Sequence, residues 1–113
     1  MKIYHNPRCR KSRETLNIIK EAGKEVDVIE YLKDVPSAPE LMDLLKKLQL
    51  KASDIIRKGE AVYKEKYKGK TLSEEEWIFA MIENPKLIER PIVINEKHGI
   101  IGRPPEKVLS LFA

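Results

Sequence analysis

The sequence lacks several features that define whole classes of protein. Its 113 residues include a single cysteine, so no disulfide can form within the chain, and a disulfide-rich secreted fold is excluded. No apolar run approaches the roughly 20 residues of a membrane-spanning helix. The N-terminal residues also lack the apolar core and cleavage site of a signal peptide. We therefore expect a cytoplasmic protein that does not associate with a membrane.

Aromatic residues and excess charge are also scarce. Aromatic side chains make up 6% of the chain and do not alternate with basic ones, as they would on a surface that stacks nucleic-acid bases. The 22 basic and 18 acidic residues leave a net charge of only +4, so no nucleic-acid partner is expected. The length is that of one domain, and the apolar content of 42% is typical of a globular protein.

The hydrophobic pattern at the N-terminal end predicts a β-α-β unit. Residues 3–4 form a short strand, and apolar residues at helical spacing predict a helix over about 12–22, with Gly23 just past its end. Residues 26–29 form a second strand. Two strands joined in this way lie parallel and are connected by a right-handed crossover.

The C-terminal end predicts a hairpin and a helix. Residues 91–94 and 100–101 form two antiparallel strands around a turn, and a last helix is expected over about 105–111. That helix is predicted to bury Val108, Leu109 and Phe112. The two ends together predict an α/β fold with a four-stranded mixed sheet, in the order β-α-β … β-β-α.

The middle of the chain is predicted to be helical. Ser37 and Ser73 each stand three residues before a glutamate and next to an apolar run, which is the capping-box pattern of a helix start. A short helical piece is expected over 52–56, whereas the lysine-rich stretch 62–70 is predicted to be a solvated connection. The sequence therefore predicts one domain, 1–113, with a helical insertion over about 35–86.

The cysteine stands in the most informative segment. Cys9 falls between a predicted strand and a predicted helix N-terminus, where unpaired N–H groups and the helix dipole favour an anion. Four cations surround it in sequence, namely Arg8, Arg10, Lys11 and Arg13. Such surroundings lower a thiol pKa and predict a reactive thiolate. The alternative is a buried structural cysteine, which charged neighbours disfavour.

The neighbours of Cys9 allow more than one interpretation. Ser12 and Arg13, with the N–H groups of the helix, are suited to hold a tetrahedral oxyanion beside the sulfur. Ser12 also suits a simple helix N-cap, and it stands where a Cys-x-x-Cys motif has its second cysteine. His5 is placed either to help ionise Cys9 or to make a local hydrogen bond at the strand end.

Three distant arginines border predicted turns, where binding groups tend to collect. They are Arg57, Arg90 and Arg103. An isolated arginine is more often a surface residue, but its planar fork of donors is well suited to gripping an oxyanion.

These motifs together resemble the glutaredoxin-dependent arsenate reductase family, which shares its fold with thioredoxin and glutaredoxin. The similarity runs through essentially the whole chain. The matching pieces are Ile3-Tyr4-His5-Asn6-Pro7-Arg8-Cys9, Ser12-Arg13, Ile56-Arg57-Lys58, Asn84-Pro85, Glu89-Arg90-Pro91-Ile92-Val93 and Gly102-Arg103-Pro104. Each piece alone is weak, but the set in this order and spacing is specific.

The resemblance implies a role for each matching residue. Cys9 is the nucleophile that attacks arsenate, and His5, Ser12 and Arg13 surround it. The implied oxyanion-binding residues are Arg57, Arg90 and Arg103, and Pro91 is the implied cis-proline. The resemblance implies neither a bound cofactor nor a metal.

The resemblance also implies the partners of the reaction. The Cys9 thiolate forms an adduct with arsenate, glutathione attacks as co-substrate, and glutaredoxin resolves the Cys9–glutathione disulfide. The sequence supports one part independently, because a chain with one cysteine needs an external resolving thiol.

Two other functions stay open beside this one. The first is a glutathione-linked thiol oxidoreductase or redox sensor, which would not need the three arginines. The second is a regulator that binds RNA polymerase, as some relatives do, although those commonly use a Cys-x-x-Cys switch and Ser12 removes it here. Arg10-Lys11 also replaces the small residues that lie between cysteine and serine in arsenate reductases.

Overall fold

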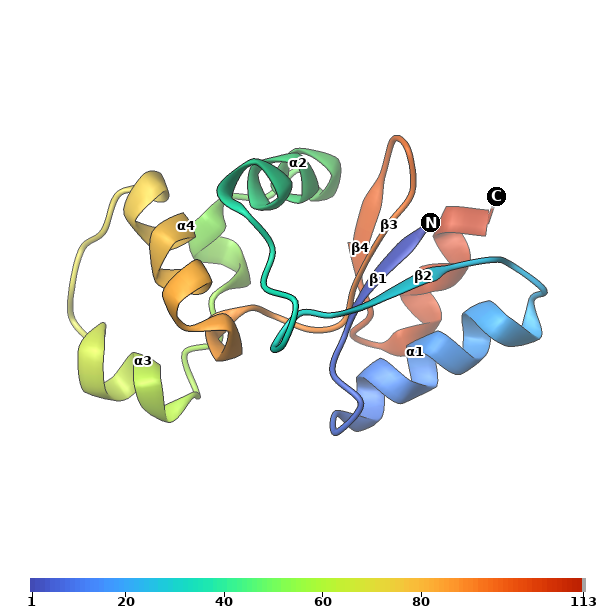
Figure 1. Cartoon of the computed structure of the whole chain (residues 1–113), viewed down its shortest axis with the longest axis horizontal. Coiled ribbons are helices and arrows are strands. Elements are labelled where there is room, and N and C mark those ends of the chain that lie inside the picture. Colours follow the sequence, from blue (N-terminus) through green and yellow to red (C-terminus); the bar gives the residue numbers. More distant parts are fainter. Residues whose placement is uncertain (113) are drawn as a thin grey trace. The chain divides into compact units, whose positions relative to one another are not determined.

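A computed structural model describes residues 1–112, and the chain divides into two compact units. One unit is Met1–Asp34 together with the chain from Arg90 onward, and the other is Val35–Glu89 (Figure 1). The second unit occupies the region where the sequence predicts an insertion over about 35–86. No helix within the described 112 residues is long and apolar enough to cross a membrane.

The first unit is built on a four-stranded mixed sheet. Its elements are β1 (Lys2–His5), α1 (Arg10–Glu21), β2 (Asp27–Glu30), β3 (Ile92–Ile94), β4 (Gly99–Ile101) and the 3-10 helix η3 (Pro105–Phe112). The strand order is β2-β1-β3-β4, with β1 parallel to β2 and antiparallel to β3. This confirms the predicted α/β class and the β-α-β … β-β-α order.

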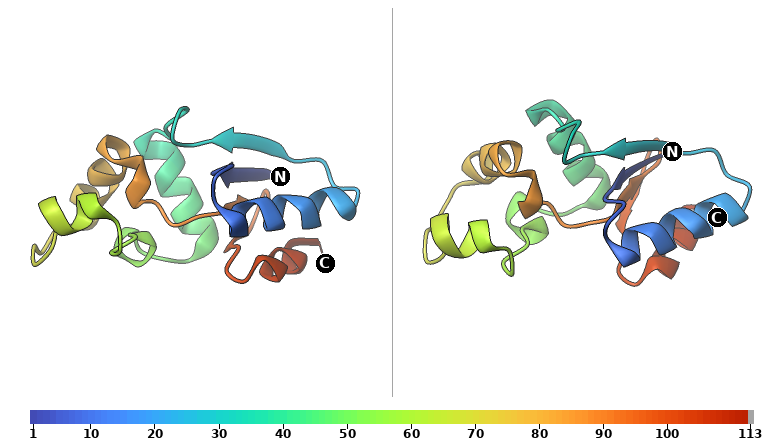
Figure 2. Two further views of the ribbon diagram at one scale, coloured as in Figure 1. Left: turned by 90° about the horizontal axis from the view of Figure 1, so that it is seen from below. Right: turned by 60° about the horizontal axis from the view of Figure 1, so that its bottom comes forward.

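One face of this sheet carries the core of the first unit. Ile3 of β1, Val93 of β3, Ile19 of α1 and Val108 of η3 form a cluster whose members are all 0% exposed. Because residues from both helices enter the same cluster, α1 and η3 cover the same face of the sheet. Figure 2 shows the two helices side by side beneath the strands.

Helix α1 begins earlier than the predicted start at about residue 12. Its first helical residue is Arg10 and its N-cap is Cys9, which has extended backbone angles (φ −92°, ψ 122°). The N–H group of Arg13 donates to the Cys9 carbonyl at 3.0 Å, which closes the first turn. The hydrophobic period did not reveal this turn because its residues are charged or polar.

The last helix is also different from the prediction. It is a 3-10 helix, in which every third residue shares a face. Pro105 and Val108 are therefore buried and Leu111 is partly buried, whereas Leu109 turns outward and is 52% exposed. The prediction that Leu109 is buried is wrong because it assumed an α-helical period.

The second unit is helical, and local capping signals define its main helices. Its elements are α2 (Ala38–Leu48), η1 (Ala52–Ile55), α3 (Ala61–Lys66), α4 (Glu74–Glu83) and η2 (Pro85–Leu87). Both predicted capping boxes are present, Ser37 with Glu40 and Ser73 with Glu76. Helix α4 ends at Glu83, with Asn84 as its C-cap directly before Pro85, as the sequence predicts.

Helix α3 corrects part of the prediction of a solvated connection over 62–70. None of its residues is buried, as expected of a solvated segment, but Ala61–Lys66 are helical. Two tyrosines four positions apart nevertheless pack on Trp77 of α4. The ring centroids of Tyr63 and Tyr67 lie 6.3 and 5.7 Å from that of Trp77. This tertiary aromatic contact stabilises a turn of helix that helical propensity alone does not predict.

Candidate active site

Cys9 follows the carboxyl end of β1, in a turn held by local hydrogen bonds. The Cys9 N–H group donates to the Asn6 carbonyl at 3.0 Å, and the Arg8 N–H group donates to Asn6 Oδ1 at 3.0 Å. Arg13 reaches back from α1, and its Nη1 atom donates to the Pro7 carbonyl at 2.9 Å. Arg13 therefore braces the turn that presents the cysteine.

Arg103 is brought to the cysteine from the far end of the chain. Its Nη2 atom lies 3.8 Å from Cys9 Sγ, which is hydrogen-bonding distance for sulfur. Its Nε atom donates to the Arg90 carbonyl at 2.8 Å, which fixes the direction of the guanidinium. A guanidinium held in this way favours a negative charge on the sulfur and on any anion bound next to it.

The segments around Arg90 and Gly102 are hydrogen-bonded to each other beside Arg103. The Arg90–Pro91 peptide bond is cis, as the resemblance implies, and so is Arg103–Pro104. The Gly102 N–H group donates to the Pro91 carbonyl at 2.9 Å. A Cβ atom on Gly102 would lie 2.5 Å from Thr15 Oγ1 and 2.7 Å from Pro91 Cγ, so only glycine fits there without a shift.

The surroundings of Cys9 lower its pKa. Burial alone would raise the pKa of the thiol, because it disfavours the charged form. The N–H groups of Ser12 and Lys11 at the start of α1 act in the other direction, and so does the guanidinium of Arg90. The hydrogen bonds and the Arg90 charge outweigh the effect of burial, so the pKa of Cys9 is lowered below its ordinary value and the thiolate is favoured.

His5 and Ser12 form a buried pair behind the cysteine. The Nδ1 atom of His5 lies 2.6 Å from Ser12 Oγ, and the same oxygen accepts from the Asn6 N–H group at 3.1 Å. Ser12 is fully buried inside α1, so it is not the helix N-cap; that alternative is wrong, because Cys9 holds that position. Ser12 instead ties the end of β1 to the first turn of α1.

His5 is best described as a neutral imidazole. Burial lowers its pKa, the carboxylate of Glu30 acts in the opposite direction, and Lys20 and Arg13 lower the pKa further. With Nδ1 facing the Ser12 hydroxyl, the ring is suited to accept that proton and keep its own on Nε2. The contact resolved for His5 is thus with Ser12, the local hydrogen bond that the sequence left as one of two options.

Arg57 belongs to the other unit. Its Nη1 atom lies 2.7 Å from Glu89 Oε1 and its Nε atom 3.4 Å from Glu60 Oε1, and its backbone N–H group donates to the Leu87 carbonyl. Two of the three implied oxyanion-binding arginines therefore share a unit with Cys9. The third is held between carboxylates within Val35–Glu89.

Sequence reasoning missed several residues that shape the site. Gly102 lies close to Thr15 of α1. Thr15 is fully buried, and its Oγ1 atom donates to the Lys11 carbonyl at 2.8 Å. Asn6 supplies the side-chain acceptor of the turn. Only the Asn-Pro pair gave a signal, as a turn former; the need for glycine at 102 depends on packing that no local pattern records.

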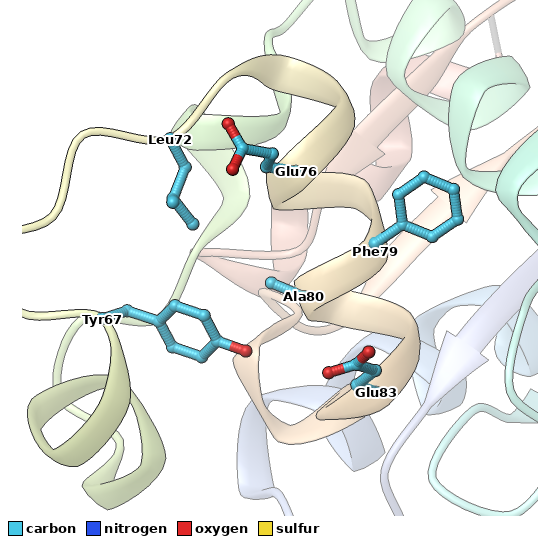
Figure 3. A pocket seen from close by; sticks show the side chains of 6 residues that line it. All are labelled: Tyr67, Leu72, Glu76, Phe79, Ala80 and Glu83. Carbon is cyan, nitrogen blue, oxygen red and sulfur yellow. The ribbon is translucent and has the colours of Figure 1, made fainter.

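A hollow in the second unit differs from the surroundings of Cys9 in the sign of its charge. Figure 3 shows it along α4, with Leu72 and Tyr67 on one side of the helix and two carboxylates, Glu76 and Glu83, at its rim. Its volume is about 270 Å³. Carboxylates repel an oxyanion and the lining holds no nucleophile, so this hollow does not compete with Cys9 as an oxyanion site. Residues 1–112 also contain no group of three His, Cys, Asp or Glu side chains placed to hold a metal ion.

A cysteine with a lowered pKa at the end of the first strand of this mixed sheet, in a unit whose strand β3 follows a cis-proline, defines a thioredoxin-like thiol site. The model of the ArsC family matches residues 4–111. This chain belongs to the ArsC family.

Individual relatives agree with this assignment. The chain is similar to YfgD of Escherichia coli K12, with 52% identity over 113 residues, covering 98% of this chain and 95% of YfgD. It is 42% identical to the arsenate reductase of Haemophilus influenzae, with 96% of each chain covered. Among solved structures it is similar to an arsenate reductase from Vibrio cholerae, with a TM-score of 0.92, 46% identity and 97% of each chain covered.

Proposed function

We propose that this protein is an arsenate reductase in which the Cys9 thiolate is the nucleophile and an external thiol is the reductant. The observation that carries the proposal is the position of the Arg103 guanidinium, 3.8 Å from Cys9 Sγ, at the start of α1. Relatives that share 37–42% identity with nearly the whole of this chain are named arsenate reductases, which supports the choice of substrate.

The first step is nucleophilic displacement at arsenic. The Cys9 thiolate forms a sulfur–arsenic bond, and one arsenic–oxygen bond breaks so that the oxygen leaves as water after protonation. Arsenic stays As(V) in this step. Arg103 and Arg90 stabilise the negative oxygens of the bound anion, and the lowered pKa of Cys9 keeps the sulfur ionised.

The second step reduces arsenic and needs a thiol from another molecule. The thiolate of glutathione bonds to Cys9 Sγ, the sulfur–arsenic bond breaks, and its electron pair stays on arsenic, which leaves as As(III). The two sulfurs become a mixed disulfide. A further thiol, supplied by glutaredoxin, attacks the glutathione sulfur of that disulfide and releases Cys9 as thiolate.

The direct test is a coupled assay with arsenate, glutathione, glutaredoxin and the NADPH-dependent glutathione reductase. We expect arsenate-dependent loss of NADPH that disappears in Cys9→Ser. Arg10→Ala is a matched control, because Arg10 is adjacent to Cys9 in the chain but 85% exposed and paired with Glu14. Arsenate-dependent turnover that survives in Cys9→Ser would refute the proposal.

One observation supports a second candidate, a glutathione-linked thiol oxidoreductase on the same site. Arg57 is engaged by Glu89 and Glu60, and simple disulfide exchange does not require a third arginine. For the arsenate reductase we propose Arg57 as a third oxyanion-binding residue, so Arg57→Ala separates the two functions. It should lower arsenate turnover, whereas a disulfide exchanger keeps its rate with a glutathionylated substrate.

A further inference from the structure

A second cavity lies in the same unit as Cys9, on the side of β1 away from Arg90 and Arg103. It has a volume of about 190 Å³ and is lined by residues 5–8, Glu30, Leu32 and Lys33. Residues 6–8 are the turn that leads into Cys9, and Cys9 closes that turn through its N–H bond to Asn6. The wall of the cavity is therefore continuous with the active-site loop.

The charges of this cavity are available to a ligand. The side chains of Arg8 and Lys33 make no ion pair or hydrogen bond with any residue among 1–112. Glu30, the one carboxylate, acts electrostatically on buried His5. Leu32, which is 37% exposed, and Pro7 add an apolar portion to the lining. Two free cations and one carboxylate beside an apolar wall suit a small zwitterionic molecule with a free carboxylate.

The sheet places this cavity and the arginines on opposite sides of β1. His5 at the end of β1 is paired with Glu30 of β2, next to the cavity. On the other edge of β1, Tyr4 is paired with Ile92 of β3, which follows Arg90 and Pro91. The oxyanion-binding groups therefore approach the Cys9 loop from the β3 side, and the cavity lies on the β2 side.

This arrangement matches the chemistry of the reducing step. Displacement at sulfur requires the incoming thiolate, the attacked sulfur and the leaving atom to lie in line. With arsenic held by Arg90 and Arg103, the incoming thiol arrives from the side away from β3. The cavity then lies where the rest of that thiol molecule passes.

On these grounds, and resting on the proposed function, we propose that this cavity binds the carboxylate end of the small thiol that attacks Cys9. Arg8 and Lys33 hold the carboxylate, and the apolar wall receives the adjoining chain. In glutathione the carboxylate-bearing glycine is one peptide unit from the cysteine. Arg8 directly precedes Cys9 in the chain and lines the cavity.

The test uses an exchange that contains no arsenate. Cys9, the only thiol of the chain, is first converted to its mixed disulfide with uncharged 2-thiopyridine. Glutathione then bonds to Cys9 Sγ, the sulfur–sulfur bond to the reporter breaks, and the reporter leaves with the electron pair as a coloured thiolate. The probe is glutathione compared with its glycine ethyl ester, which has the same thiol without that carboxylate.

We expect wild-type protein to react faster with glutathione than with the ester, by about fivefold. Arg8→Ala and Lys33→Ala should each reduce this preference, and Lys33→Glu should remove or reverse it. Arg10→Ala is the matched control: it removes an exposed cation near Cys9 that does not line the cavity, and it should keep the preference.

Two results would overturn the inference. One is equal reactivity of the wild type with glutathione and the ester. The other is a preference that persists in both Arg8→Ala and Lys33→Glu, because the carboxylate would then be held elsewhere. Absence of arsenate turnover with an intact preference would instead refute the proposed function and leave this thiol-binding cavity in place.

Discussion

The two units of this chain are specified over very different distances along the sequence. In Val35–Glu89, the starts of α2 and α4 are each determined by a serine and a glutamate three residues apart. In the sheet unit, the contact that defines the site joins Cys9 to Arg103, which are 94 positions apart. Helix starts are thus local properties of the chain, whereas the reactive centre exists only after the sheet has formed.

This comparison predicts how the two units respond to mutation. A change in the sheet unit should alter both stability and the chemistry of Cys9, because the same contacts hold the fold and orient the arginines. A change at a helix cap in Val35–Glu89 should cost stability alone. The following experiments test that division, from the largest expected effect to the smallest.

Removing the Arg103 guanidinium should have the largest effect. Arg103→Ala should lower kcat/KM for arsenate by about 100-fold, which is the usual cost of losing one donor to a developing oxyanion. Arg103→Lys keeps the charge but loses the fork and should recover only part of the rate. Steady-state kinetics in the coupled assay measures both. A loss below threefold for Arg103→Ala would show that the arginine acts on the fold alone.

Gly102→Ala should destabilise the sheet unit by about 2 kcal/mol, because the new Cβ atom overpacks against Thr15 and Pro91. It should also slow alkylation of Cys9, since Arg103 follows directly and moves with the backbone. Urea denaturation and iodoacetamide labelling measure the two effects. Gly59→Ala is the control, because nothing lies within 4 Å of a Cβ atom there. Equal stability of the two variants would contradict the packing argument.

Ser12→Ala should cost about 2 kcal/mol of unfolding free energy, as it leaves His5 Nδ1 and the Asn6 N–H group buried without this partner. The pH dependence is a second readout. Because the pKa of His5 is lowered in the folded state, protonation favours unfolding, so stability should fall as pH decreases below about 6.5. His5→Gln should weaken that pH dependence; an unchanged profile would show that another group causes it.

A break in the local capping of the helical unit should have a smaller and purely structural effect. Ser73→Ala removes the capping oxygen of α4 and should cost about 1 kcal/mol. The alkylation rate of Cys9 and its dependence on pH should not change. Ser73→Asp restores an acceptor and should recover the stability. A changed Cys9 profile in Ser73→Ala would break the division between the two units.

The smallest effect is a displacement of the Cys9 titration. The pKa of Cys9 is lowered in the folded protein, so its alkylation rate should reach half its maximum at a lower pH than a free thiol does. Arg90→Ala removes one of the groups that favour the thiolate, so the midpoint should move upward. An unchanged midpoint would assign the lowered pKa to the helix N–H groups alone.

Much of the fold was predictable because it depends on local patterns. Alternating and helical apolar spacing revealed the strands and main helices, and Ser37 and Ser73 marked two helix starts correctly. The failures occurred where tertiary contacts overruled such patterns. Helix α3 depends on tyrosines that pack on Trp77, and η3 adopts a three-residue period that exposes Leu109.

Only part of the candidate site was predictable from local patterns. Charged neighbours and a predicted helix start identified Cys9 without any structure. Arg90 and Arg103 had no local signal that distinguished them from surface arginines, and only the family resemblance selected them. The close approach at Gly102 and the cavity beside residues 5–8 had no signal in the sequence at all.

The sequence by itself thus predicted most of the elements, the class of fold and Cys9 as the candidate nucleophile, because hydrophobic period, capping residues and charge act between near neighbours. Tertiary structure alone decided which arginines reach the sulfur and where a cavity opens. Those features depend on the pairing of β1 with β2 and β3, which brings together segments that are distant in the chain.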